Sequence, residues 1–301
     1  MIRTSYHRTL IGLALALVLA GANFFSAYAQ QKPNSKFKGV QVGTITYSYR
    51  SMPDQSLEAI LDYIVKSGIN SVELMGGPVE AFAGIPETKD ENELKQWRIK
   101  AGMDKFKEAA RMFSKKGVDI HILKLGNPKW SDEEIDYAFR AAKAVGAKGI
   151  SMEISEETAK RMAPFADKHK MYVILHNHGQ PGQPGFSFEK ILAHGDRLML
   201  NFDVGHYFGA TGDNPVNVLK RLHHRIVSIH IKDKTGPKAA NPNQNQAFGS
   251  GETPVAEILK AISQNKWPIF CDVELEYTVP TDSDAVKEVG KCVQYLKAAL
   301  Q

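Results

Sequence analysis

Two patterns of hydrophobic and polar residues alternate along the chain. Short apolar runs typical of buried parallel strands occupy 40–47, 71–75, 118–124, 149–154, 172–177, 198–203, 226–232 and 269–276. Between and after them, apolar residues recur three and four positions apart, as on one face of a helix. Eight strands alternating with eight helices predict a single α/β domain folded as a (β/α)8, or TIM, barrel.

Residues that favour helix ends set the limits of several predicted helices. Ser131, followed three positions later by Glu134, has the pattern of a capping box for a helix that runs to Gly146. Asp284 begins the last helix, which ends near Leu300. The other predicted N-caps are Ser56, Ser155 and Ser187.

Two long segments are predicted to be loops at the carboxyl end of the barrel. Residues 76–97 follow the second strand, and residues 233–251 follow the seventh. The second segment is rich in Asn, Gln, Gly and Pro. It cannot form a core, and it suits a mobile lid or a specificity loop.

The first residues have the pattern of a secretory signal peptide. Arg3, His7 and Arg8 form a basic start, an apolar stretch covers 10–20, and the small residues at 27 and 29 fit a cleavage site. The stretch is too short for a membrane-spanning helix. We therefore expect a cleavable signal peptide at 1–29, a flexible lead-in at 30–38 and the barrel at 39–301. This predicts export, to the periplasm in a bacterium, of a product without a stable membrane anchor.

Charge and cysteine content narrow the functional classes. The formal net charge is +5, part of it in Arg3 and Arg8. Such a mild excess gives no support for nucleic-acid binding, which needs clustered basic residues. Two cysteines cannot form a disulfide scaffold, and we expect Cys271 and Cys292 to be buried free thiols. The sequence leaves a homo-oligomer open.

Four of the apolar runs carry metal-binding residue types near their carboxyl ends. These are Glu153, Asp203, His230 and Glu274. Each alone has a structural explanation, such as Asp203 capping the next helix. Parallel barrel strands converge on one rim, however, where ligand sites lie. Three carboxylates and one imidazole form a mostly hard donor set, so we predict one divalent ion there, Mn²⁺ first, with Mg²⁺, Co²⁺ or Zn²⁺ as alternatives.

Two glutamates flanking a divalent ion predict a reaction type. The ion polarises a carbonyl or hydroxyl of a bound sugar, while one of Glu153 and Glu274 removes a proton from the neighbouring carbon and the other returns one. The intermediate is an enediolate, which the surrounding charges stabilise.

The succession of Glu153, D-x-x-H at 203–206, H-x-K-D at 230–233 and V-E at 273–274 resembles the xylose isomerase-like TIM barrels. This sugar phosphate isomerase/epimerase family includes D-tagatose 3-epimerase, inosose-processing enzymes and a DNA-repair endonuclease. The resemblance covers the chain after the leader. It implies that Glu153, Asp203, His230 and Glu274 bind the metal, that Glu153 and Glu274 are the acid/base pair, and that His206 holds substrate oxygens. The run ending at Glu252 resembles the family's Gly-x-Gly-Glu loop, and this likeness makes Glu252 a candidate substrate-binding residue.

The sequence departs from this family at two places. The fifth strand often ends E-N-H in the family, whereas residues 176–178 here read His-Asn-His. Gly236 lies where ketose 3-epimerases have an arginine that grips the substrate, which argues against that activity. Glu276 shares a strand face with Glu274 and is an alternative ligand.

Other residues are predicted to contact the substrate or to be structural. His178 and Glu73 lie at strand ends, and Lys232 shares a face with His230, so we expect substrate contacts from all three. A core histidine is the alternative for His178, and a solvated lysine is the alternative for Lys232. His121 is expected to be a core residue. Trp97 and Trp130 follow loops on the active face, and we expect them to pack, with stacking on a sugar ring as the alternative.

The sequence therefore predicts an exported, metal-dependent isomerase or epimerase acting on a non-phosphorylated carbohydrate or polyol. Phosphorylated sugars are normally cytosolic, which disfavours them as substrates. One alternative is a 3-keto-glycoside lyase or hydratase using the same metal and glutamate pair. A second is a non-catalytic sugar-binding barrel. An endonuclease would need more histidines at the rim and a basic face.

Overall fold

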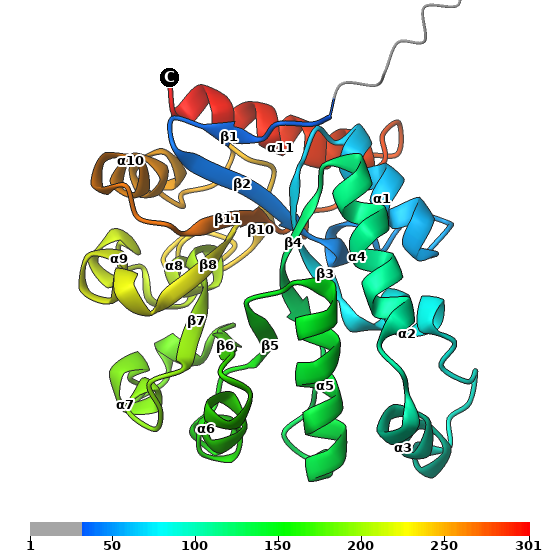
Figure 1. The fold of residues 1–301 in the computed structure, drawn as a ribbon. Helices are drawn as coiled ribbons and strands as arrows, with labels where there is room; N and C mark the ends of the chain where they lie inside the picture. Colours follow the sequence, from blue (N-terminus) through cyan, green and yellow to red (C-terminus); the bar gives the residue numbers. More distant parts are fainter. Residues whose placement is uncertain (1–31) are drawn as a thin grey trace, which may run out of the picture. The chain divides into compact units, whose positions relative to one another are not determined.

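The computed structural model describes residues 32–301 (Figure 1). The predicted signal peptide at 1–29 lies outside the described residues, so it stays a prediction together with export. Of the predicted lead-in, Lys36–Phe37 forms the short strand β1, which pairs antiparallel with β2. Ser35 is buried there and donates a hydrogen bond to the Val42 carbonyl, at 2.6 Å. The end of the lead-in is therefore attached to the barrel.

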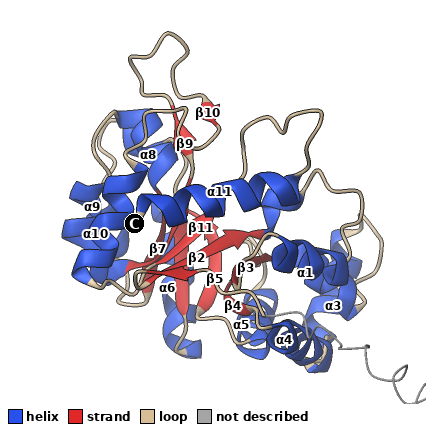
Figure 2. Cartoon of the chain, turned by 90° about the horizontal axis from the view of Figure 1, so that it is seen from above, coloured by secondary structure: helices blue, strands red, loops and turns tan. Residues whose placement is uncertain are grey.

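Eight parallel strands form a closed barrel, as the sequence predicts. The sheet order is β1-β2-β11-β8-β7-β6-β5-β4-β3, and pairing between β2 and β3 closes it. The parallel strands are β2 Val40–Ile45, β3 Ser71–Met75, β4 Asp119–Lys124, β5 Gly149–Glu153, β6 Tyr172–His176, β7 Leu198–Asp203, β8 Ile226–Ile231 and β11 Phe270–Val273. Figure 2 shows these strands in the interior of the domain and helices around them.

Helices follow the strands and begin at the predicted caps. Ser131 and Glu134 form the expected capping box. Ser56, Ser155, Ser187 and Asp284 each accept a hydrogen bond from a backbone N–H in the first turn. These helices and their counterparts after the other strands are α1 Leu57–Lys66, α4 Asp104–Lys116, α5 Asp132–Val145, α6 Glu156–His169, α7 Phe188–Leu192, α9 Val216–Leu222, α10 Val255–Asn265 and α11 Ala285–Ala299.

The interpretation of residues 76–97 as a long loop is wrong. The segment contains α2 Gly76–Ala83 and the first residues of α3 Glu91–Lys100. Gly84 ends α2 in a left-handed conformation, and Asp90 caps α3 by accepting from two backbone N–H groups. The first of these helices is short, and the second has no strong apolar face, so neither produced a periodic pattern.

The segment 233–251 forms an extended excursion with a fixed base. The strands β9 Asp233–Lys234 and β10 Asn245–Gln246 pair antiparallel within it (Figure 2). Asp233 Oδ2 accepts hydrogen bonds from the N–H groups of Gly249 and Gly251, at 2.8 and 2.9 Å. Both ends of the excursion are therefore tied to one carboxylate.

Inside the barrel, several buried polar side chains are connected by hydrogen bonds that the sequence did not predict. His121 lies between Ser71 Oγ and Asp272 Oδ2, at 2.9 and 2.8 Å, and stacks on Phe270. Ser228 donates to the same carboxylate. His121 is thus a core residue, as predicted. Cys271 and Cys292 are buried and free, also as predicted.

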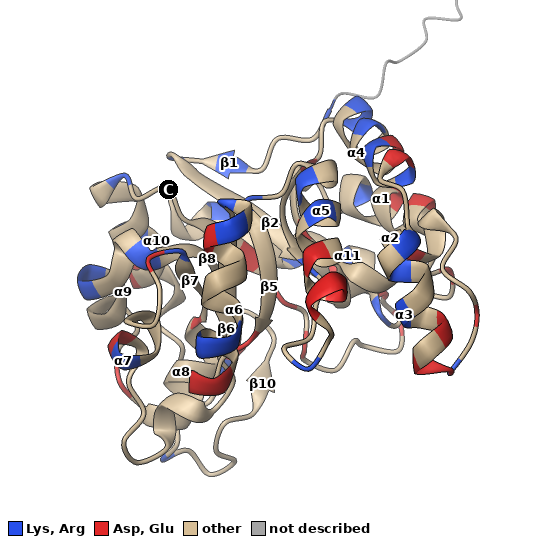
Figure 3. Cartoon of the chain, turned by 60° about the horizontal axis from the view of Figure 1, so that its bottom comes forward, with Lys and Arg blue, Asp and Glu red and all other residues tan. Residues whose placement is uncertain are grey.

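Acidic and basic residues share the outer helices. In Figure 3 both signs occur on helices such as α4 and α6. None of the helices in residues 32–301 is long and apolar enough to cross a membrane.

One buried arginine joins three of the helices. Arg98 on α3 lies 3.1 Å from Glu80 of α2 and 3.3 Å from Glu134 of α5, with its guanidinium over the Trp130 ring. Tyr137 also donates to Glu80, at 3.0 Å. Trp130 therefore packs structurally, as the sequence suggested.

Replacing Arg98 with Met should lower the free energy of unfolding by about 3–5 kcal/mol, because two buried carboxylates lose their counter-charge. Urea denaturation measures the change. Lys105→Met is the matched control: its ion pair with Glu108 is exposed and should contribute less than about 1 kcal/mol. Equal effects of the two substitutions would contradict the role assigned to Arg98.

Candidate active site

Four buried side chains come together at the carboxyl end of the barrel. They are His176 at the end of β6, Asp203 at the end of β7, His230 in β8 and Glu274 just after β11. One nitrogen or carboxylate oxygen from each lies within 4.8 Å of those of the other three. Three of the four residues predicted to share an ion are therefore together, and His176 stands where Glu153 was expected. We call these four residues the rim cluster.

His230 is held by carboxylates on both ring nitrogens. Its Nδ1 lies 2.8 Å from Glu274 Oε2, and its Nε2 lies 2.7 Å from Glu73 Oε2. Burial would lower the pKa of His230, but the two carboxylates raise it well above its ordinary value. Burial likewise opposes ionisation of Glu73, yet the His230 ring brings its pKa down to about 2. A carboxylate that holds the far nitrogen of an imidazole is common around metal-binding histidines.

Asp203 both caps a helix and belongs to the rim cluster. Its Oδ1 accepts a hydrogen bond of 2.7 Å from the His206 N–H at the start of α8 Val204–Thr211. Asn177 fixes its backbone from both sides: Oδ1 accepts from the Asp203 N–H, and Nδ2 donates to the Asp203 carbonyl. The other carboxylate oxygen, Oδ2, is buried and lies 2.8 Å from Lys232 Nζ and 3.4 Å from His176 Nε2.

Lys232 brings a buried ammonium group to the same place. Its Nζ lies 2.8 Å from Asp203 Oδ2, 2.6 Å from Glu274 Oε2 and 2.7 Å from Glu276 Oε2. Burial would lower the pKa of Lys232, but these three carboxylates raise it above its ordinary value. Gly205 makes room for the lysine, since a Cβ there would come within 2.2 Å of Lys232 Cγ.

Glu153 lies beside the rim cluster, in a second group with two histidines. Its carboxylate is 3.0 Å from His178 Nδ1, 3.4 Å from His176 Nδ1 and 3.0 Å from Lys124 Nζ. The Glu153 side chain is 52% exposed, whereas that of His176 is 2% exposed. Burial alone would raise the pKa of Glu153, but the two imidazoles and Lys124 lower it by more. The pKa of Glu153 therefore lies below its ordinary value. The hydrogen bond with Glu153 in turn raises the pKa of His178 above its ordinary value.

The remaining predicted residues fall into two classes. Glu73, His178 and Lys232 lie at the site through the contacts given above. His206 Nε2 is 3.5 Å from Glu276 Oε2, and burial lowers the pKa of His206 to about 4. Glu252, in contrast, accepts a hydrogen bond from the Gly236 N–H, at 2.8 Å, and supports the 233–251 excursion.

Several site residues lie outside the predicted set. Strand alternation indicates two of them, because Lys124 and His176 each follow an apolar residue of the barrel interior, Ile122 and Ile174, by two positions. Asn201 precedes Asp203 by two positions in the same way, and it donates to Glu73 at 2.7 Å.

The rim cluster fits a divalent ion. Two imidazoles and two carboxylates carry a formal charge of −2 when the imidazoles are neutral, which matches a divalent cation. Asp203 Oδ2 and His176 Nε2 are both buried and lie 3.4 Å apart, and among the described residues this imidazole nitrogen has no hydrogen-bond partner. With His176 in place of Glu153 the donor set has more nitrogen than predicted, which favours Mn²⁺, Co²⁺ or Zn²⁺ over Mg²⁺.

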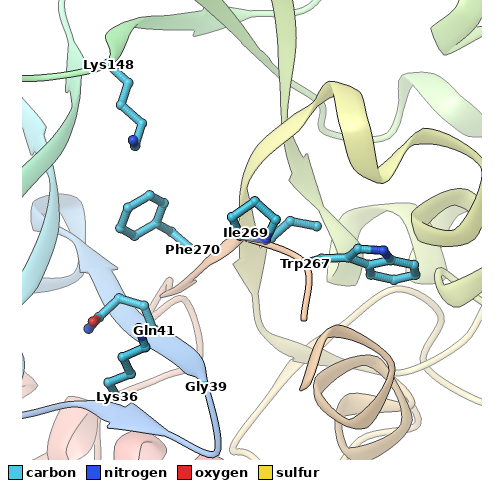
Figure 4. Close-up of a pocket in the computed structure, with 8 residues that line it drawn as sticks. Lys36, Gly39, Gln41, Lys148, Trp267, Ile269 and Phe270 are labelled. Atoms are coloured by element: carbon cyan, nitrogen blue, oxygen red, sulfur yellow. The ribbon is translucent and has the colours of Figure 1, made fainter. Parts of the chain in front are cut away.

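A separate cavity of about 310 Å³ lies at the opposite end of the barrel. It is lined at the amino ends of the strands by residues that include Lys36, Gln41, Lys148, Trp267 and Phe270 (Figure 4). Barrel enzymes keep their catalytic residues at the carboxyl end, so we assign this cavity no catalytic role.

Known proteins with similar sequences match the second half of the chain. A sequence profile of the family described as "Xylose isomerase-like TIM barrel" matches residues 151–298. Two proteins named inosose dehydratase, from Clostridium botulinum strains Alaska E43 (Type E3) and Eklund 17B (Type B), are each 28% identical over 148 residues. The match covers 44% of this chain and 49% of each relative. The chain thus spans about half the length of the curated relatives it matches.

Solved structures resemble the whole barrel. A sugar phosphate isomerase/epimerase from Parabacteroides distasonis has a TM-score of 0.61 and 18% identity, covering 86% of this chain and 94% of that one. The probable 3-DHS dehydratase of petrobactin synthesis from Bacillus anthracis has a TM-score of 0.61 and 16% identity, covering 85% and 99%. An L-ribulose 3-epimerase has a TM-score of 0.57 and 10% identity, covering 87% and 94%. At these identities the likeness establishes the fold alone.

Replacing Gly205 with Ala should lower the free energy of unfolding by about 1–3 kcal/mol, because the added methyl group overlaps the Lys232 stem and its carbonyl. Chemical denaturation measures the effect. The matched control is Gly290→Ala within α11, where a Cβ meets nothing within 4 Å. That change should raise stability by about 0.5–1 kcal/mol through helix propensity. A neutral Gly205→Ala would contradict the packing described for Lys232.

Proposed function

We infer, from the premise that the chain belongs to the xylose isomerase-like TIM barrel family through residues 151–298, that it is a divalent-metal-dependent enzyme. It removes a proton next to a carbonyl of a carbohydrate or polyol, and the product is an isomer or epimer of the substrate. The observation that carries this proposal is the rim cluster of His176, Asp203, His230 and Glu274.

The rim cluster would hold the ion, which when bound would polarise a carbonyl or hydroxyl oxygen of the substrate. Glu274 is the proposed base. Lys232 and His230 contact its Oε2 and keep the carboxylate ionised, as the strongly lowered pKa of Glu274 despite burial indicates. A carboxylate held in this way accepts a proton only from a carbon that the active site has acidified.

Glu153 and His178 are the proposed second proton-transfer pair. Both side chains are about half exposed and 3.0 Å apart, beside the rim cluster. Their exposure lets them exchange a proton with the substrate or with solvent. The predicted pairing of Glu153 and Glu274 as acid and base is retained, with His178 added as the partner that holds Glu153.

We propose that the substrate is not phosphorylated and that the enzyme acts on it outside the cytoplasm. Each of the lysines at the rim already has a partner within the protein. Lys124 pairs with Glu153, Lys232 pairs with three carboxylates, and Lys234 donates a hydrogen bond of 2.7 Å to the Asn245 side chain. A phosphate would have to displace one of these partners. The signal-peptide pattern of residues 1–29 supports periplasmic export independently.

Elimination is the second candidate reaction. In a 3-keto-glycoside, the carbon next to the carbonyl that would lose its proton is carbon 2. The substituent at carbon 1 would then leave with its bonding electrons, and the enzyme would be a lyase or hydratase. The names of the two sequence relatives support this candidate, because both are called inosose dehydratases.

The purified protein should bind one divalent ion per chain, measured with Mn²⁺ by calorimetry. Asp203→Asn should weaken binding at least tenfold, on the order of the loss known for altered metal ligands and their supports. The amide oxygen can still cap α8, so the fold should persist. Asp213→Asn, on the exposed surface, is the control and should bind as the unaltered protein does. Unchanged binding by Asp203→Asn would contradict the assigned site.

Product analysis should separate the two reactions. The protein with Mn²⁺ is incubated with free ketohexoses and with 3-keto-glucosides in deuterated water. Interconverted, deuterium-labelled sugars indicate epimerisation, and release of the carbon-1 substituent indicates elimination.

For the active reaction, Glu274→Gln should reduce kcat by about 10²–10⁴, the usual contribution of a positioned base. Glu108→Gln, on the exposed face of α4, should leave kcat unchanged. If neither substrate class reacts and Glu153→Gln preserves sugar binding, the protein is a non-catalytic binding barrel.

A further inference from the structure

One buried ammonium group contacts the oxygens that a metal ion at the rim cluster would need. Lys232 Nζ lies 2.8 Å from Asp203 Oδ2 and 2.6 Å from Glu274 Oε2. Both carboxylates belong to the rim cluster. The Lys232 side chain is 3% exposed, so it cannot be an incidental surface lysine.

We propose that Lys232 competes with the divalent ion for Asp203 and Glu274, and that Glu276 retains the ammonium group when the ion binds. The proposal rests on the proposed metal site and adds to it a residue that sets metal affinity and selectivity. The chain thus carries its own competing cation.

Distance explains why the two cations exclude each other. A divalent ion binds carboxylate oxygens at about 2.0–2.2 Å. An ion on the same two oxygens as Lys232 Nζ would lie only about 3–4 Å from the ammonium, and that repulsion acts in a buried setting where solvent screens little. The ammonium must therefore withdraw from Asp203 and Glu274 for the ion to bind them.

Glu276 is the carboxylate that can receive the displaced group. It already lies 2.7 Å from Lys232 Nζ, it is outside the rim cluster, and its side chain is 20% exposed. Its Oε2 also lies 3.5 Å from His206 Nε2. Lys232 can therefore keep one of its three partners while it gives up the other two.

Gly205 restricts how the lysine moves. A Cβ at position 205 would fall 2.2 Å from Lys232 Cγ and 3.2 Å from Cδ, so the inner part of the stem lies directly against the start of α8. Rotation is then limited to the outer bonds of the side chain. This short swing moves the ammonium group toward Glu276 without rearranging the barrel.

The test measures Mn²⁺ binding by calorimetry in a double-mutant cycle of Lys232→Met and Glu276→Gln. Lys232→Met should bind Mn²⁺ at least tenfold more tightly than the unaltered protein, because the competitor is gone. Glu276→Gln should bind Mn²⁺ at least about threefold more weakly than the unaltered protein, because the Lys232 ammonium loses its alternative partner. The double variant should match Lys232→Met.

Lys168→Met is the control, since Lys168 pairs with Asp136 on the exposed surface, away from the rim cluster. It should change Mn²⁺ affinity less than threefold. Equal or weaker binding by Lys232→Met would overturn the competition. If no variant binds Mn²⁺, the metal site itself fails, which is a different outcome from loss of the competition alone.

A measurement on the unaltered protein covers the case in which Lys232→Met does not fold. Lysine acetylation is mapped by mass spectrometry with and without Mn²⁺. Acetylation of Lys232 should rise at least threefold with Mn²⁺, while the exposed Lys66 stays constant. No change at Lys232 in a sample that binds Mn²⁺ would overturn the proposal.

Discussion

Mutual repulsion of carboxylates at the end of the barrel is the constraint that organises this site. Glu73, Glu153, Asp203, Glu274 and Glu276 all lie at one rim, and each raises the cost of ionising the others. Each of them contacts a cation or an imidazole. His230 joins Glu73 to Glu274, Lys124 and His178 hold Glu153, and Lys232 joins three carboxylates. The positive groups therefore determine which carboxylates can lie together.

The backbone around Asp203 keeps these charges in place. Asn177 contacts both the N–H and the carbonyl of Asp203, and the aspartate in turn caps α8. Gly205, two residues later, leaves the space that Lys232 occupies. One turn of chain thus links the helix cap, the rim cluster and the lysine, so a change in any of them alters the other two.

The barrel could be predicted because its signals are local. Eight apolar runs and five capping residues identify the strands and most of the helices, and parallel pairing then brings the strand ends together. The helices α2 and α3 could not be predicted in the same way. Their stability comes from tertiary contacts such as the Arg98 ion pairs with Glu80 and Glu134, which no periodicity records.

The site was only partly predictable, because whether a residue belongs to the rim cluster depends on how deeply its side chain lies in the barrel. Glu153 and His176 are neighbours in register, yet the histidine is buried in the rim cluster and the glutamate is half exposed beside it. Residue type favoured the carboxylate. Counting two positions from the inward-facing Ile174 would have favoured His176, since alternate residues share a face.

The exchange of a carboxylate for an imidazole in the rim cluster affects the proposed chemistry. It lowers the negative charge around the ion by one, so a bound ion keeps more of its own charge to polarise a substrate oxygen. It also frees Glu153 from metal binding, and a free carboxylate transfers protons more readily than a coordinated one. A site with one glutamate, Glu274, among the proposed ligands of the ion and another, Glu153, beside it can therefore assign the two glutamates different tasks. The same arrangement serves either epimerisation or elimination, because both begin with removal of a proton next to a carbonyl.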